Sequence, residues 1–476
     1  MSSNSSVDDR LDPRLLGTTA VILLGGLLGI LNSTMAAVAT DTLAAAFDTS
    51  LSTIGWASTG FLLAVTATIP FTTWAVDRFG GKRLWVAGLL IFLVGSLAAG
   101  LSWNVGSLIA FRVLQGFGAG LLDPLVLILL ARAAGPRRAG RVMGLMGVVL
   151  SLGPVLGPIA GGAILDAFEW RWMFLIGVLV GVVALVLALR VIPADGPGEG
   201  GGARLDVLGL ALLGPGFAVV VLALSQVAEQ GAFTAWQVLL PLGAGAAVLI
   251  GYAVHALRTT PGGRPPLIDL RLFANRGFTA SVTIMGLGGM AVFASLFALP
   301  LYYQQAHGHG VLAAGLLMAP VGLGGSIAMP VAGRLSDRLS PRGLATGGAL
   351  VAALSGLALT RIGADTPEIL PVLASLGIGL GMGCFSAPAM GSLYRALPPE
   401  MVAQGSSVLY MLNQLGAALG VALVTLIFQT SGDPIGGVHG VYWFAVGMIV
   451  IVLVMIPLLP GRPRTPVVQD GLTRTS

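Results

Sequence analysis

Residues 147–162, GVVLSLGPVLGPIAGG, would make a poor helix in a water-soluble protein. Glycines recur at every fourth residue, so they share one helix face, and two prolines have the same spacing. In water each glycine costs about 1 kcal/mol and each proline removes a hydrogen bond. In a bilayer, small residues permit close packing and neighbouring helices satisfy the freed backbone groups. The pattern therefore predicts a tightly packed membrane helix. Its residues are Gly153, Gly157, Gly161 and Gly162, with Pro154 and Pro158.

The composition excludes most other classes of protein. The chain has 476 residues, of which 55% are hydrophobic and 9% charged, and its mean hydropathy is +0.92. Soluble domains carry about 25% charged residues, so this is a polytopic membrane protein. The single cysteine, Cys384, excludes an intramolecular disulfide framework and a thiolate metal cluster. No phosphate-binding loop is found, which argues against direct coupling to ATP, and no cofactor or metal is predicted.

Apolar runs of about 20 residues are long enough to cross the hydrocarbon core. They predict an all-α protein with fourteen transmembrane helices and no β-sheet. The predicted helices span residues 15–40, 53–75, 84–102, 107–131, 142–165, 172–190, 206–227, 235–257, 277–303, 312–333, 343–360, 368–391, 405–428 and 439–459.

The basic residues predict the orientation of these helices. All but three of the 25 lysines and arginines fall on one side if the N-terminus is cytoplasmic. The exceptions are Arg171 and Arg361 on the other side and Arg112 within a helix. This distribution follows the positive-inside rule and does not resemble a nucleic-acid-binding face. We therefore expect a multi-pass protein of the bacterial plasma membrane, with both termini in the cytoplasm and no nucleic-acid partner.

Two short loops reveal an internal repeat. The sequence TWAVDRFGGKR occupies residues 73–83, and GRLSDRLSPR occupies residues 333–342. Two related six-helix units predict a transporter whose site lies between its halves. The remaining two helices are then an inserted pair. The predicted divisions are an N-terminal bundle (1–190), a linker with the inserted helices (191–264), a C-terminal bundle (265–460) and a cytoplasmic tail (461–476).

On these motifs the chain resembles the major facilitator superfamily, and within it the fourteen-helix branch of drug:proton antiporters. The matching features are the loop motif with Asp77, Arg78, Gly80, Lys82 and Arg83 and its repeat at Gly333, Asp337 and Arg338, RVLQGFGAG at residues 112–120, the glycine–proline stretch at residues 147–162, and EWRWMF at residues 169–174. The resemblance covers almost the whole chain. It implies two six-helix bundles, alternating access, and export of drugs driven by the proton gradient.

Two positions depart from the family pattern. The first helix usually carries an aspartate where this chain has Asn32, which cannot carry a proton. The loop motif usually begins with glycine, and here it begins with Thr73.

Ionisable residues inside the membrane are costly and mark functional sites. Asp123 is the only acid deep within a predicted helix, where desolvation favours the neutral form that can exchange protons. Arg112 lies eleven residues earlier, within about 20° of the same face and about 16 Å away along the helix. In the family the residue matching Arg112 is implicated in proton transfer. We predict Asp123 as the main protonation site; the alternative is a structural acid satisfied by hydroxyl groups or an arginine.

Asp41 is the rival acid. It falls at the predicted outer end of the first helix, nine residues after Asn32 and on the opposite face of an unbroken helix. It could be an outer gate or cap, or a second proton site.

The repeated Asp-Arg pairs, Asp77 with Arg78 and Asp337 with Arg338, predict a conformational latch on the cytoplasmic side. Each aspartate could bind a nearby helix N-terminus and loop arginines. A simple positive-inside turn is the alternative, and it explains the arginines but not the repeated aspartate.

Polar and aromatic residues within the helices suit a lipophilic or cationic substrate. The candidates are Asn32, Met35, Trp56, Phe61, Gln115, Phe293, Tyr302, Phe385, Tyr410 and Asn413. Ordinary helix packing explains any one of them equally well. His307 and His309 would need further ligands to bind a metal.

These features predict a monomeric, proton-coupled exporter whose partners are protons, membrane lipids and a small lipophilic substrate. Export of an endogenous lipid or secondary metabolite is the alternative within the same class. An intramembrane enzyme lacks a suitable set of catalytic residues. A non-transporting sensor or scaffold would not need a protonatable Asp123.

Overall fold

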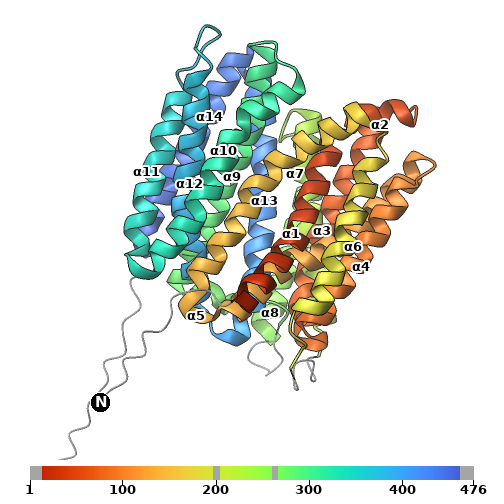
Figure 1. Cartoon of the computed structure of the whole chain (residues 1–476), viewed down its shortest axis with the longest axis vertical. Helices are drawn as coiled ribbons and strands as arrows, with labels where there is room; N and C mark the ends of the chain where they lie inside the picture. The colour runs from red at the N-terminus through yellow and green to blue at the C-terminus, as the bar shows by residue number, and fades with distance from the viewer. Residues whose placement is uncertain (1–12, 197–203, 260–265, 461–476) are drawn as a thin grey trace, which may run out of the picture.

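The computed structural model describes residues 13–196, 204–259 and 266–460, and within these ranges the chain folds into helices without β-strands (Figure 1). The α-helices are α1 (Pro13–Val38), α2 (Thr40–Ala46), α3 (Leu51–Phe79), α4 (Gly81–Gly100), α5 (Val105–Ala167), α6 (Trp172–Val191), α7 (Val207–Gln230), α8 (Trp236–Thr259), α9 (Arg276–Gln305), α10 (Val311–Arg338), α11 (Pro341–Leu359), α12 (Ile369–Ala396), α13 (Val402–Ser431) and α14 (Pro434–Met455). Short 3₁₀ helices are η2 (Leu270–Ala274), η3 (Pro399–Met401) and η4 (Ile456–Leu458).

Fourteen helical segments in the described ranges are long and apolar enough to cross a membrane, which confirms the predicted number. Two of them, Val105–Ala134 and Val142–Ala167, belong to the single helix α5. The sequence predicted a break there, but the backbone stays helical through the turn. The chain nevertheless reverses direction between these two segments of α5. Helix α5 starts just after α4 ends, and α6, which follows α5, begins beside that same end of α4, where Ser96 Oγ donates to Phe174 O over 3.0 Å.

The helices form the predicted two bundles and an inserted pair. The N-terminal half contains α1 to α6, and the C-terminal half contains α9 to α14. The two halves lie side by side in Figure 1. Helix α7 packs against α8 and also against α3 and α13, which come from different halves. The inserted pair therefore covers a seam between the two halves.

We call the end of the molecule with the α3–α4 and α10–α11 turns the basic end, since Arg78, Lys82, Arg83 and Arg342 lie there. One large hydrophobic cluster fills the middle and the basic end and contains residues from both halves. Towards the opposite end the core divides into separate clusters. Two of them are each confined to one half, and a small third one joins α7 and α8 to α13. The hydrophobic core common to both halves thus lies in the middle and at the basic end, which indicates that the molecule is closed at that end. Helices α5 and α10 also stay in contact towards the opposite end, where Gly315 faces Ile159.

The α3–α4 turn is held by a residue that the sequence did not single out. The carboxylate of Asp195, beyond α6, accepts hydrogen bonds from Lys82 N over 2.8 Å and Arg83 N over 3.2 Å, and so satisfies the N-terminus of α4. Lys82 Nζ in turn donates to Leu189 O over 2.8 Å and Ile192 O over 2.6 Å at the end of α6. Gly80 sits between them with φ of 88°, and a Cβ atom there would collide with Asp195.

Candidate functional site

Arg112, on α5, lies at the centre of a polar cluster inside the N-terminal half. Its side chain is only 1% exposed. Nη1 donates to Asn32 Oδ1 over 2.6 Å and to Gln115 Oε1 over 2.7 Å, while Nε donates to Ala57 O over 3.3 Å. The guanidinium carbon lies 4.2 Å from the ring centroid of Phe61. This one side chain therefore ties together α1, α3 and α5.

No carboxylate pairs with Arg112 among the described residues; its acceptors are two amides and a backbone carbonyl. Two further donors of the cluster, Arg112 Nη2 and Gln115 Nε2, are buried without a hydrogen-bond partner. Asn32 occupies the position where the family pattern has an aspartate. The charge of the guanidinium is therefore offset by dipoles and aromatic rings and not by an opposite charge.

Asp123 lies further along α5, where the two halves meet. Its side chain is half-buried, and Oδ1 is 3.8 Å from the position that a Cβ atom on Gly29 of α1 would take. Tyr410 of α13, from the other half, is close enough to Asp123 to interact with it electrostatically. In the described part of the chain Asp123 makes no hydrogen bond or ion pair. It is therefore a carboxyl group between the halves with no protein partner, unlike the satisfied structural acid that was the alternative.

The predicted substrate residues fall into different surroundings. Three of them belong to the Arg112 cluster, and four others are buried in packing contacts or exposed at the surface. The first three are Asn32, Phe61 and Gln115. Of the other four, Met35 packs against Gly161, Phe385 packs against Gly288, and Tyr302 lies in the core of the C-terminal half. The fourth, Trp56, is 41% exposed. Phe293, Tyr410 and Asn413 are half-buried. Tyr410 is the one that lies near Asp123, so these two residues form the best-supported candidate site.

The loop aspartate Asp77 makes an ion pair, but within its own half. Asp77 Oδ1 is 3.3 Å from Arg132 Nη2 of α5, and the two side chains are 47% and 35% exposed. The α4 N-terminus that the sequence offered as a partner is occupied by Asp195. Arg78 is exposed, and the side chains of Asp337 and Arg338 lie outside the described residues. The latch therefore stays a prediction.

The glycine–proline stretch packs against α1 through its glycine face. A Cβ atom on Gly153 would contact Ile30, and one on Gly157 would overlap Thr34. Gly161 faces Met35, whereas a Cβ atom on Gly162 would meet nothing within 4 Å. Pro154 and Pro158 are half-buried. The stretch thus forms a close α1–α5 seam.

Asp41 does not continue the first helix. The helix breaks at Ala39, and Asp41 lies exposed in the first turn of α2. At the same end, His309 Nε2 is 2.6 Å from Glu368 Oε1 and His307 Nε2 is 2.9 Å from the hydroxyl of Tyr302. The described residues contain no group of three ligands suited to a metal ion.

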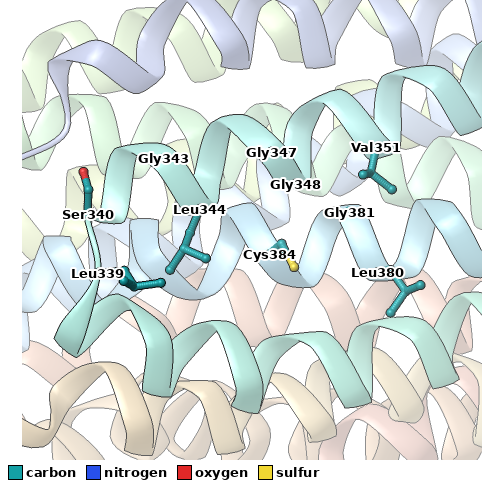
Figure 2. Close-up of a pocket in the computed structure, with 10 residues that line it drawn as sticks. All are labelled: Leu339, Ser340, Gly343, Leu344, Gly347, Gly348, Val351, Leu380, Gly381 and Cys384. Carbon is teal, nitrogen blue, oxygen red and sulfur yellow. The ribbon is translucent and has the colours of Figure 1, made fainter.

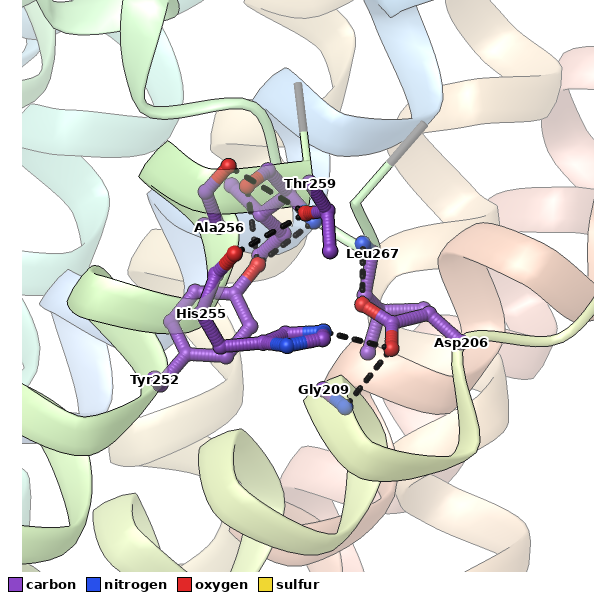
Figure 3. Close-up of polar contacts among 8 residues, drawn as sticks. Asp206, Gly209, Tyr252, His255, Ala256, Thr259 and Leu267 are labelled. Atoms are coloured by element: carbon purple, nitrogen blue, oxygen red, sulfur yellow. Dashed lines mark hydrogen bonds and ion pairs between the residues drawn. The ribbon is translucent and has the colours of Figure 1, made fainter. Parts of the chain in front are cut away.

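Two other features lie away from the seam. A groove of about 570 Å³ runs along the outside of α11 and α12, and glycines such as Gly343 and Gly347 leave it open (Figure 2). At the basic end, Asp206 accepts from Gly209 N over 2.8 Å and Leu267 N over 3.3 Å, and lies 2.8 Å from His255 Nε2 (Figure 3). These contacts of Asp206 hold together the start of α7, the end of α8 and the segment that leads to α9.

Comparison with known proteins places this geometry in one family. Residues 22–421 match the model described as Major Facilitator Superfamily. The Multidrug resistance protein B homolog of Mycobacterium tuberculosis (strain ATCC 25618 / H37Rv) is 38% identical over 429 residues, covering 90% of this chain and 78% of that protein. The Multidrug export protein EmrB of Escherichia coli (strain K12) is 30% identical over 423 residues, covering 87% and 80%. The Riboflavin transporter RibZ of Clostridioides difficile (strain 630) is 30% identical over 415 residues, covering 86% and 88%.

Solved structures share the fold at low sequence identity. The proton:xylose symporter XylE aligns with a TM-score of 0.67 at 16% identity, covering 94% of this chain and 96% of that one. The human organic anion transporter MFSD10 aligns with a TM-score of 0.63 at 15% identity, covering 94% and 100%.

Proposed function

We propose that this chain, which belongs to the major facilitator superfamily, exports lipophilic or cationic compounds across the membrane in exchange for protons. It is a multi-pass membrane transporter and not an enzyme. Relatives named for multidrug resistance and multidrug export support transport of drugs, and the lipophilic or cationic character of the substrate is inferred from the residues of the site. The proton coupling is inferred from the site itself, and the direction of transport is inferred from the expected cytoplasmic position of the basic end.

The observation that carries the proposal is the position of Asp123. It is the one carboxyl group in the interior of a described transmembrane segment, and it lies between the halves. No group in the described part of the chain forms a hydrogen bond or an ion pair with it. A carboxylate cannot be enclosed in a low-dielectric seam without a compensating charge. Either a proton or a cationic substrate supplies that compensation. Because only one of them can occupy the site at a time, movement of one is coupled to movement of the other.

Arg112 has a different part in this mechanism. Asn32 cannot titrate, so no second carboxyl group stands beside Arg112 to receive a proton. The guanidinium instead holds α1, α3 and α5 together as the halves move. Proton exchange therefore rests on Asp123.

Alternating access gives the order of events. In this structure the basic end, which we expect to face the cytoplasm, is closed by the shared core. Opening that end exposes Asp123 to the cytoplasm, where the proton leaves and a cation binds. Closing it and opening the opposite end lets an external proton displace the cation.

The test is proton release from purified protein on addition of ethidium. Wild-type protein should release protons and Asp123→Asn should release none, because an amide does not titrate and so has no acidic proton for the cation to displace. Asp166→Asn is the matched control, since Asp166 lies exposed at the far end of the same helix. Substrate-linked proton release that persists in Asp123→Asn would overturn the assignment. In liposomes with an imposed pH gradient, the same variant should lose ethidium transport.

The relative named as a riboflavin transporter shows that a similar chain carries a metabolite, so we keep export of an endogenous metabolite as a second candidate. The same proton site would serve both substrates. Expression in a pump-deficient host separates them: raised resistance across a panel of lipophilic cations supports drug export. Unchanged resistance together with proton-linked metabolite transport supports the second candidate.

A further inference from the structure

The two halves are joined at the basic end by a hydrogen bond between side chains. Thr73 Oγ1 of α3 donates to Ser407 Oγ of α13 over 2.8 Å, and Ser407 Oγ lies 3.4 Å from Ile69 O of α3. Thr73 is 4% exposed and Ser407 is fully buried. Both residues lie in the part of the molecule where the core is shared by the two halves. These hydroxyl groups can meet only while the basic end is closed.

The other close contacts between the halves are of a different kind. Helix α5 meets α10 through glycines: Gly144 and Gly147 face Met329, and Gly325 faces Ser151. Most of these contacts depend on shape and tolerate sliding of one helix along the other. The one hydrogen bond among them, from Ser151 Oγ to Met329 Sδ over 3.7 Å, has a weak sulfur acceptor. The Thr73–Ser407 hydrogen bond is directional, so it distinguishes the closed arrangement from one in which the two helices have moved apart.

The internal repeat shows that this hydroxyl is an addition to the loop motif. Aligned on the Asp-Arg pairs, Thr73 corresponds to Gly333 in the second half, which has no side chain to donate. The rest of the motif is accounted for by Asp77 with Arg132 and by Lys82 with α6. The side chain at position 73 therefore has a role of its own, distinct from that of the other residues of the motif.

We propose that Thr73 and Ser407 are positioning residues for transport, whose hydrogen bond biases the protein towards the conformation closed at the basic end. A single buried hydrogen bond changes a conformational ratio by about five-fold, which is enough to set the resting state and still allow opening. In the open state each hydroxyl can bond to water or to a carbonyl of its own helix. The inference rests on alternating access as proposed above, but it does not depend on the substrate or on the coupling ion.

The test measures the distance between the halves by electron paramagnetic resonance, with Cys384→Ser as background. Spin labels at Ser52→Cys and Asp365→Cys report the opposite end, and labels at Arg83→Cys and Arg334→Cys report the basic end; all four sites are exposed. Thr73→Val and Ser407→Ala should each shift the population about five-fold towards the form open at the basic end. The double variant should shift no further than Ser407→Ala alone, because that change removes both the bond to Thr73 and the 3.4 Å contact with Ile69 O. Thr73→Ser keeps the hydroxyl and should behave as wild type.

Thr72→Val is the matched control. Thr72 is the preceding residue, is equally buried, and donates to Gly120 O over 3.2 Å within the N-terminal half. Its removal should affect stability without changing the distances between the halves. Unchanged distances in Thr73→Val and Ser407→Ala, or an equal shift in Thr72→Val, would overturn the proposal. The measurement uses neither substrate nor protons, so failure of the proposed exporter function would leave its outcome unaffected.

Discussion

At the scale of single residues, the chain separates two charges that the family pattern would place together. Arg112 is buried and bonded to amides, whereas Asp123 stands alone between the halves. The hydrogen bonds of Arg112 stabilise the N-terminal half, because separating a buried guanidinium from its acceptors is energetically costly. Asp123 serves exchange, because a buried carboxyl group without a partner binds whatever neutralises it. Asn32 is the residue that makes this division possible.

The Arg112 cluster yields a prediction about stability. Asn32→Leu removes the acceptor 2.6 Å from Nη1 and leaves the charge with fewer partners, so it should lower the free energy of unfolding by about 1–3 kcal/mol. Asn32→Asp keeps the shape and adds an opposite charge, so it should be at least as stable as wild type. Thermal unfolding of the purified proteins compares them. A melting temperature for Asn32→Leu equal to that of wild type would show that Asn32 Oδ1 contributes nothing.

Sequence reasoning found the ionisable residues of the site but not their partners. Arg112 and Asp123 are detectable because charges inside apolar runs are rare. The bond from Arg112 to Asn32 depends on how α1 meets α5, which no local pattern encodes. The partner of Thr73 is 334 residues away along the chain, so its role is visible only in the folded protein.

At the scale of helices, the glycine face of α5 decides how closely α1 can approach. Gly157→Ala would place a methyl group on the side chain of Thr34, so the two helices must separate. We expect transport to fall several-fold and stability to drop by about 1–3 kcal/mol, as overpacking of a core does. Gly162→Ala is the control, since its methyl group would meet nothing within 4 Å. Equal transport by the two variants, measured as efflux from proteoliposomes, would contradict this role for the seam.

The positions of the helices were largely predictable, because each needs about 20 apolar residues. Most ends lie within a few residues of their predicted positions, as in α6 (Trp172–Val191). The exception is α5, whose helical backbone continues through a turn that charge and length mark as a loop. The cap on α4 was also missed: Asp195 is distant in sequence, and only the positive φ at Gly80 hints at a required close approach.

At the scale of the whole molecule, the two halves and the inserted pair share one asymmetry. The buried core is common at the basic end and divided at the other, and α7 spans the α3–α13 seam. The inserted pair thus adds contacts to both halves without entering the site beside Asp123. Because two helices are added together, the C-terminal half should keep the same orientation as the N-terminal half.

This orientation can be tested with cysteines at Ser52, Arg83 and Gly343, in the Cys384→Ser background and with a membrane-impermeant maleimide. Only α3 separates Ser52 from Arg83, so they should react from opposite faces, with Arg83 on the cytoplasmic face because basic residues collect there. Gly343, at the start of α11, should react from the same face as Arg83, because an even number of spans, α7 and α8 included, lies between them. Labelling in right-side-out and inverted vesicles gives the answer. Opposite faces for Arg83 and Gly343 would mean that an odd number of helices crosses the membrane between them, as when only one of α7 and α8 spans it. Reversed labelling of all three sites would instead place the basic end outside and reverse the proposed direction of transport.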